Sequence, residues 1–264
     1  MNRLDKFFAS SNKRKALTIY YTCGCPDKES TVDNIIKLID SGADIIELGV
    51  PFSEPMADGP VIQQAAEVAI KNDTTLSDSF DITVKIREKR NDVPVVLFTY
   101  YNIIFKYGVE KALSEFAKAG GDALLIVDLP FEEQDELNEY CEADNLQMIQ
   151  LIAPETPKDR MAKIAAAAKG FIYMVTVNGV TGERTELPEE LAEKIRTLKS
   201  LTSVPVLAGF GISDAETAKI ASADCDGVIV GSAVMKGILE LNSQPEKLAE
   251  ACKLVNSISA VLKE

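Results

Sequence analysis

Short apolar runs rich in β-branched residues recur along the chain, and segments with helical spacing of apolar residues separate them. Such runs indicate strands. The predicted strands are residues 16–23, 44–50, 94–100, 123–129, 148–154, 171–177, 205–210 and 227–233. Because the runs are almost continuously apolar rather than alternating, they are typical of parallel strands that are buried on both faces.

The segments between these strands carry helix signals. After the first strand, apolar residues recur at helical spacing from Val32 to Ile39, Asp27 or Ser30 is available to cap the start, and Gly42 follows the end. Further amphipathic stretches occur at 187–198, at 215–223 and at 248–262. Strands therefore alternate with helices along the whole sequence.

This alternation in a chain of 264 residues favours a (β/α)8 TIM barrel with an extra N-terminal helix. A doubly wound open sheet is the competing fold. It would be expected to carry G-x-G-x-x-G after the first strand, where this chain has Cys23-Gly24-Cys25-Pro26. No linker-like segment is found, so we expect a single domain over residues 1–264.

Composition and charge narrow the function. The formal charge of −13 argues against a nucleic-acid surface, and it means that a phosphorylated substrate would need a strong local site. No run of apolar residues is long enough for a membrane helix, and the first residues lack the apolar core of a signal peptide, so we expect a cytoplasmic protein without membrane contact. The five cysteines lack C-x-x-C spacing, which disfavours disulfides and a metal site.

The chain contains no histidine, so proton transfer would fall to carboxylates, tyrosines or lysines. Glu47 lies within a strand predicted to be buried on both faces. Burial would raise its pKa and suit it to general acid–base work, unless a Lys or Arg pairs with it. Asp58 lies in the long loop after the same strand, where it either contributes to a site or simply caps the helix that begins at Pro60 or Val61.

Glycines after the last two predicted strands suggest an anion site. Gly209, Gly211 and Gly231 permit close approach of backbone amides, and Ser232 opens a helix whose N-terminus favours negative charge. Loops seven and eight frequently hold phosphate in such barrels. The polar loop 178–188 could close over the site as a lid or be an ordinary connector.

Specific motifs then make the chain resemble the tryptophan synthase alpha chain family over essentially its whole length. They are Glu47-Leu48-Gly49-Val50-Pro51-Phe52-Ser53, Ala57-Asp58-Gly59-Pro60, Gly179-Val180-Thr181-Gly182 and Gly209-Phe210-Gly211-Ile212-Ser213. The resemblance implies retro-aldol cleavage of indole-3-glycerol phosphate to indole and glyceraldehyde 3-phosphate, without a cofactor in this subunit. The implied partner is a pyridoxal-phosphate beta subunit in an alpha2-beta2 heterotetramer, with Glu54 and Pro55 near the contact.

The resemblance also implies residue roles. Glu47 would be the catalytic acid–base group, and Asp58 would hold the indole N–H as charge develops. The implied substrate-binding residues are Tyr20, Tyr100, Leu151, Tyr173 and the lid residue Thr181. The implied phosphate-binding residues are Gly182, Gly211, Gly231 and Ser232.

Three positions depart from the family pattern. Glu54 replaces the usual Asp, Cys25 replaces the Asp of Gly-Asp-Pro, and Val177-Asn178 lacks the usual basic residue before the lid motif. They leave open two alternatives: a divergent regulatory subunit that activates a beta partner, and a stand-alone lyase that releases indole.

Overall fold

The strands form one parallel barrel in a computed structural model that describes residues 2–10, 14–175, 189–209 and 211–263. The sheet order is β5-β4-β3-β2-β1-β9-β8-β7-β6, and every pairing is parallel. The strands are β1 (Ala16–Thr22), β2 (Ile45–Gly49), β3 (Val95–Thr99), β4 (Ala123–Ile126), β5 (Gln147–Met148), β6 (Gln150–Ile152), β7 (Ile172–Val175), β8 (Val206–Gly209) and β9 (Gly227–Val230).

The two ends of that order, β5 and β6, are separated by only one residue, Ile149. The predicted fifth strand is therefore split into two short strands, of which β5 pairs with β4 and β6 pairs with β7. Because one chain segment joins both edges of the sheet, the sheet closes on itself. The eight predicted strands and the barrel are confirmed.

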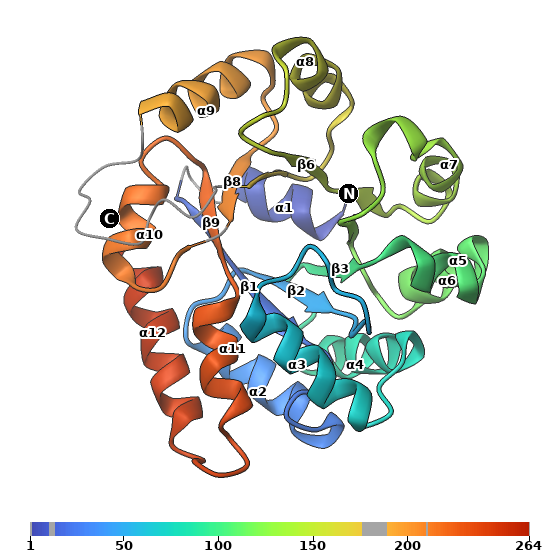
Figure 1. The fold of residues 1–264 in the computed structure, drawn as a ribbon, viewed down its shortest axis with the longest axis vertical. Helices are drawn as coiled ribbons and strands as arrows, with labels where there is room; N and C mark the ends of the chain where they lie inside the picture. Colours follow the sequence, from blue (N-terminus) through green and yellow to red (C-terminus); the bar gives the residue numbers. More distant parts are fainter. Residues whose placement is uncertain (1, 11–13, 176–188, 210, 264) are drawn as a thin grey trace.

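Helices surround the strands as a ring (Figure 1). They are α1 (Arg3–Ser10), α2 (Lys28–Asp40), α3 (Pro60–Lys71), α4 (Leu76–Lys89), α5 (Tyr101–Tyr107), α6 (Val109–Lys118), η1 (Phe131–Glu133), α7 (Asp135–Ala143), α8 (Lys158–Ala167), α9 (Glu189–Leu201), α10 (Ala215–Ala221), α11 (Ser232–Leu239) and α12 (Lys247–Leu262). Asp27 caps α2 by accepting the Ser30 amide, as the sequence allowed.

Two apolar layers hold the barrel together. Alternate strand residues such as Ile45, Val96 and Leu207 fill the interior, while their neighbours pack against the helices. Both faces of each strand are thus buried, which explains the continuous apolar runs in the sequence. Since all strands run in parallel, their carboxyl ends meet at one rim of the barrel.

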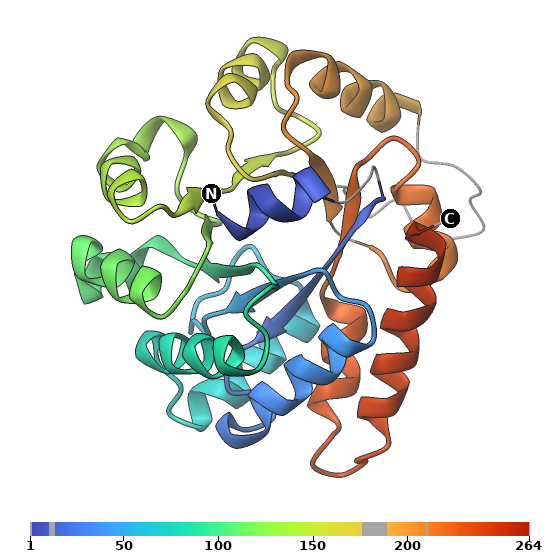
Figure 2. The ribbon, with the colours of Figure 1, turned by 180° about the vertical axis from the view of Figure 1, so that it is seen from behind.

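Helix α1 covers the opposite, amino-terminal end of the barrel, and Figure 2 shows it lying across this opening. Its Leu4 is fully buried among the interior residues. Arg3 and Arg87 both donate to the buried Asp122 carboxylate, at 3.0 and 2.6 Å, and the Val95 amide donates to it at 2.9 Å. These bonds tie α1 and α4 to the starts of β3 and β4.

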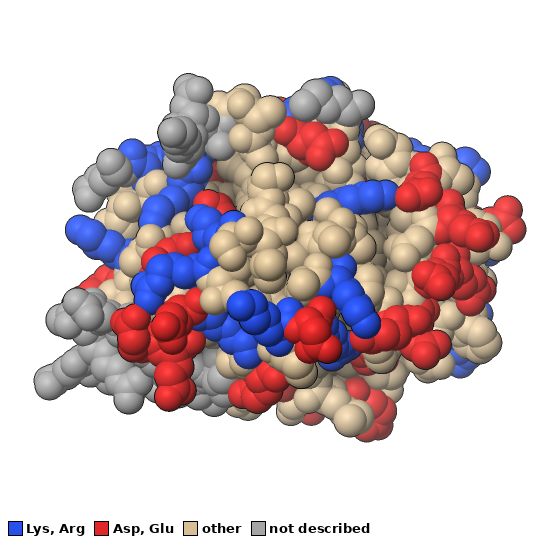
Figure 3. Space-filling view, turned by 90° about the horizontal axis from the view of Figure 1, so that it is seen from above, with Lys and Arg blue, Asp and Glu red and all other residues tan. Residues whose placement is uncertain are grey.

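Charge is mixed over the surface shown in Figure 3, where Lys and Arg side chains are interspersed with Asp and Glu. This face carries no continuous basic surface among its described residues, in keeping with the net charge of −13. No helix within the described ranges is both long and apolar enough to cross a membrane.

The buried position of Leu4 predicts a structural role for α1. Leu4→Ala should lower the free energy of unfolding by about 3 kcal/mol, because it leaves a cavity among the interior side chains. Urea denaturation measures the effect. The matched control on the same helix is Lys6→Ala, which changes an exposed side chain and should alter stability by less than about 0.5 kcal/mol. Equal stability of the two variants would contradict the role of Leu4.

Candidate active site

Glu47 occupies the middle of β2 and points into the barrel. In the strand register it lies beside Tyr20 of β1 and Val96 of β3, and it follows Ile45 by two residues on the interior face. Its side chain is 1% exposed, and its Oε1 atom has no hydrogen-bond partner in the described part of the chain. The alternative of a Lys or Arg pair is therefore wrong for the described residues.

Burial alone sets the charge state of Glu47. Because water no longer solvates the carboxylate, the pKa of Glu47 rises from 4.5 to about 8. At neutral pH the group is mostly a neutral acid, yet a proton can leave it at little cost. This is the property required of a general acid whose conjugate base is used later in the same reaction.

Asp58 lies at the rim, in the loop between β2 and α3. The alternative that Asp58 caps α3 is wrong, because the N-cap residue is Gly59. Instead, the Tyr100 hydroxyl donates to Asp58 Oδ2 at 2.9 Å. Burial raises the pKa of Asp58 to about 6, and the bond from Tyr100 opposes that rise. Asp58 is therefore mostly ionised at neutral pH.

Tyr20 is the register partner of Glu47 on β1, and Tyr173 belongs to the interior cluster of the barrel. Burial raises the pKa of both phenols well above 10, and both Glu47 and Asp58 raise each pKa further by their charge. The influence of both carboxyl groups on both phenols indicates that the four side chains are neighbours, with Glu47 inside the barrel and Asp58 at its carboxyl-terminal rim. Their surroundings thus give two neighbouring carboxyl groups different pKa values.

Two glycines leave room for the tyrosine rings. A Cβ atom on Gly49 would overlap the Tyr20 hydroxyl, and a Cβ atom on Gly209 would overlap the Tyr173 ring. Both glycines occupy interior positions at strand ends, where a side chain would fill the mouth of the barrel. Glycine is needed at Gly49 and Gly209 for close approach rather than for an unusual backbone conformation.

The remaining predicted pocket residues lie around the same mouth. Leu151 is half-buried on β6 in register with Tyr173, and Tyr100 is the first residue after β3. Sequence reasoning did not single out Phe98, whose ring meets Tyr20 edge-to-face at 5.0 Å. It also passed over the ring of Phe52, which lies 4.8 Å from Tyr100. The interior spacing of Phe98 relative to Val96 on β3 was the signal that could have identified it.

The predicted phosphate-binding residues follow neighbouring strands. Gly211 follows β8 with a positive φ of 78°, and Gly231 is the N-cap of α11, with no side chain bonded to the cap. Since β8 pairs with β9, both glycines lie at the same part of the rim. The first amides of α11, beginning at Ser232, lack intrahelical acceptors and can bind an anion. Thr181 and Gly182 lie outside the described residues, as do Val177 and Asn178.

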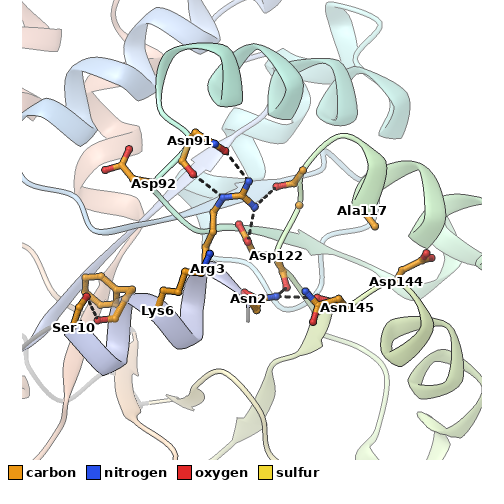
Figure 4. A pocket seen from close by; sticks show the side chains of 13 residues that line it. Asn2, Arg3, Lys6, Ser10, Asn91, Asp92, Ala117, Asp122, Asp144 and Asn145 are labelled. Atoms are coloured by element: carbon orange, nitrogen blue, oxygen red, sulfur yellow. Dashed lines mark hydrogen bonds and ion pairs between the residues drawn. The ribbon is translucent and has the colours of Figure 1, made fainter.

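A cavity of about 710 Å³ lies at the opposite end of the barrel, beside α1 (Figure 4). Arg3 extends into it and uses its donors on Asn91, Gly120 and Asp122. The carboxyl groups with raised pKa values lie at the other end. We therefore assign the candidate active site to the carboxyl-terminal mouth, which is where enzymes of this fold carry out their chemistry.

Comparison with known proteins gives a consistent result. The model of the tryptophan synthase alpha chain family matches residues 8–262. The tryptophan synthase alpha chain of Caldanaerobacter subterraneus subsp. tengcongensis is 42% identical over 264 residues, covering 99% of this chain and 100% of that protein. That of Alkalilimnicola ehrlichii is 44% identical over 257 residues, with coverages of 95% and 94%.

Solved structures agree with the sequence matches. The crystal structure of tryptophan synthase subunit alpha from Legionella pneumophila has a TM-score of 0.91 at 34% identity, and the match covers 99% of this chain and 98% of that one. An aminoacrylate-bound tryptophan synthase from M. tuberculosis has a TM-score of 0.87 at 31% identity, with coverages of 99% and 100%.

The burial of Glu47, without a charged partner in the described ranges, predicts a stability cost. The folded state holds the proton more tightly than the unfolded chain, so folding is penalised as pH rises from about 4.5 to about 8. Glu47→Gln mimics the protonated form and should be more stable than the parent by about 3 kcal/mol at pH 7, with the difference vanishing near pH 4. Urea unfolding across pH measures it, with the exposed Glu133→Gln as control. A Gln variant that is less stable at pH 7 would show that the carboxylate has a favourable partner.

Proposed function

Because this chain belongs to the tryptophan synthase alpha chain family, we propose that Glu47 and Asp58 carry out the reaction of that family at the mouth of its barrel. The reaction is the cleavage of indole-3-glycerol phosphate to indole and glyceraldehyde 3-phosphate. It is a carbon–carbon lyase reaction in tryptophan biosynthesis. The observation that carries the assignment of roles is the buried carboxyl group of Glu47, whose Oε1 atom has no hydrogen-bond partner among the described residues.

Glu47 acts first as an acid and then as a base. Its neutral carboxyl group donates a proton to C3 of the indole ring, which leaves positive charge on the ring nitrogen. The resulting carboxylate removes the proton from the glycerol hydroxyl next to the ring. The carbon–carbon bond then breaks, its electron pair restores the neutral indole, and the hydroxyl carbon becomes the aldehyde. Glu47 ends the cycle protonated, so protons and electrons balance.

Asp58 has the complementary role. Its carboxylate accepts a hydrogen bond from the indole N–H and stabilises the positive charge that C3 protonation creates on the ring. This role needs an ionised group, and the pKa of about 6 at Asp58, raised by burial, leaves it ionised at neutral pH. Tyr100 holds the carboxylate in place at 2.9 Å.

The other predicted residues bind the substrate. We assign the walls of the indole pocket to Tyr20, Tyr100, Leu151 and Tyr173, which border the mouth of the barrel. Gly211, Gly231 and Ser232 bind the phosphate group through backbone amides at the rim. By resemblance to the family, Gly182 adds a phosphate contact and Thr181 orders the site around Asp58.

The partner of this chain is a tryptophan synthase beta subunit, which consumes the indole in an alpha2-beta2 assembly. The loop between β2 and α3 offers a contact surface, because Met56 is 91% exposed and lies two residues from Asp58. Glu54, which replaces the usual Asp, is exposed in the same loop. We further propose that the chain works as one domain, residues 1–264, in the cytoplasm. Neither the regulatory-subunit alternative nor the stand-alone lyase is favoured by any comparison.

Replacement of Glu47 tests the assignment directly. Glu47→Gln keeps the size of the side chain but removes the transferable proton, so turnover should fall by at least about 100-fold. Binding of a phosphorylated indole analogue should stay near the parent value, because the phosphate site is unchanged. Indole release and calorimetric binding measure the two effects. Near-normal turnover in this variant would refute the assignment, whereas Glu133→Gln should behave as the parent.

The two pKa values predict a bell-shaped dependence of kcat/KM on pH. Activity requires ionised Asp58 and protonated Glu47, so it should fall below about pH 6 and above about pH 8. The substrate phosphate also titrates near pH 6. Tyr100→Phe distinguishes titration of Asp58 from titration of the substrate phosphate. The substitution removes a hydrogen bond that lowers the pKa of Asp58, so the acid limb should move to higher pH. An acid limb that does not move in Tyr100→Phe would belong to the substrate.

A further inference from the structure

Asp128 is an exposed carboxylate just beyond the carboxyl end of β4, and sequence reasoning assigned it no role. Its Oδ1 atom accepts the backbone N–H of Tyr101 at 2.7 Å. Tyr101 is the first residue of α5, so its amide is one of those that a helix cannot satisfy internally. Asp128 therefore supplies, from a neighbouring loop, the acceptor that α5 lacks in its own sequence.

Strand register brings Asp128 to this amide. Thr99, the last residue of β3, pairs with Ile126, the last residue of β4. The Val127 amide continues the ladder by donating to the Thr99 carbonyl at 3.2 Å. The segments that follow β3 and β4 therefore leave the sheet side by side, and Asp128 lies next to the residue at which β3 ends and α5 begins.

Tyr100 is the residue at which the chain passes from β3 into α5. Its backbone is still extended, with φ −102° and ψ 145°, and helical geometry begins at the next residue. The direction of the Tyr100 side chain therefore depends on where the first turn of α5 is held. That side chain reaches across the rim, where its hydroxyl donates to Asp58 Oδ2 at 2.9 Å and accepts the Ala57 amide at 3.0 Å.

The loop that carries Asp128 is itself anchored. Gln134 donates to the Leu129 carbonyl at 3.3 Å, and Gln150 of β6 donates to Gln134 at 2.8 Å. Both glutamine side chains belong to residues that are 4% exposed, so their bonds are shielded from water. Asp128 thus accepts the Tyr101 amide from a loop that is held to the barrel.

We propose that Asp128 is a positioning residue for the lyase reaction: by holding the Tyr101 amide, it aims the Tyr100 hydroxyl at the Asp58 carboxylate. The inference rests on the proposed function, because it needs Asp58 to act on the indole N–H. It extends the site to a residue that does not touch the substrate. It also connects the β4 loop with the loop that presents Met56.

The two possible contributions of Asp128, its negative charge and its hydrogen-bond acceptor, predict opposite effects of its removal on the pKa of Asp58. If its negative charge alone mattered, its removal would favour ionised Asp58, because like charges disfavour each other. If its acceptor matters, a neutral side chain with an oxygen in the same place should serve almost as well. Within the described part of the chain, the other titratable groups that interact electrostatically with Asp58 are Tyr20, Tyr100 and Tyr173, and Glu47 lies deeper in the barrel. These groups stay the same in every Asp128 variant.

The experiment measures glyceraldehyde 3-phosphate release by the full chain with a saturating beta subunit, because the beta subunit consumes the indole. Asp128→Ala should lower kcat/KM about threefold to tenfold, the effect of losing one positioning hydrogen bond, and should move the acid limb of the pH profile upward. Asp128→Asn keeps an oxygen acceptor and should stay within about twofold of the parent. Glu133→Ala is the control, since it removes an exposed carboxylate from the same loop and should not change kcat/KM.

A double-mutant cycle with Tyr100→Phe completes the test. If Asp128 acts through Tyr100, Asp128→Ala should have no further effect when Tyr100 is already Phe. An equal loss in both backgrounds, or parent activity in Asp128→Ala, overturns the positioning role. The proposed function is tested independently of the positioning role, because it is refuted if Glu47→Gln retains turnover. Thermal unfolding of each variant shows whether a loss of activity is only a loss of folded protein.

Discussion

The site depends on one constraint: the Glu47 carboxyl group is enclosed in an apolar barrel and has no charged partner in the part of the chain that the structure describes. Glu47 has no water to stabilise its charge and no Lys or Arg within the described residues to replace that water. The barrel therefore holds a neutral acid at physiological pH, although a glutamate in water would be ionised. A catalyst without histidine gains in this way a group that titrates near neutrality.

The fold supplies the other half of the arrangement. Parallel strands end at one rim, so residues far apart in sequence, such as Asp58, Leu151 and Ser232, border the same opening. Because β5 and β6 together close the sheet into a barrel, the strand ends form a continuous ring. The interior below it is packed, and α1 covers the far end. A substrate can therefore reach the barrel only at its mouth. The mouth is formed by loops, whose sequences can change without disturbing the packed barrel below them.

Tyr100 connects the chemistry to the surface. Its hydroxyl bridges the Asp58 carboxylate and the Ala57 amide, and its ring lies against Phe52. The same loop presents Met56 to solvent on its other side. A partner that contacts Met56 would therefore press on the segment whose conformation sets the position of the Asp58 carboxylate, to which we assign the indole N–H. This geometry gives a short physical path from the exposed side chain of Met56 to the Asp58 carboxylate.

The strands, their burial on both faces and the barrel could be predicted from the amino-acid sequence alone, because continuous apolar runs and helical spacing are local signals. The sequence also singled out Glu47, since a carboxylate inside such a run has no exposed face available. Three facts became visible in the folded chain alone: Glu47 Oε1 has no hydrogen-bond partner among the described residues, Gly59 rather than Asp58 caps α3, and Phe98 and Phe52 border the mouth. Those facts depend on which side chains meet across strands and loops distant in sequence, and register and loop geometry set those meetings.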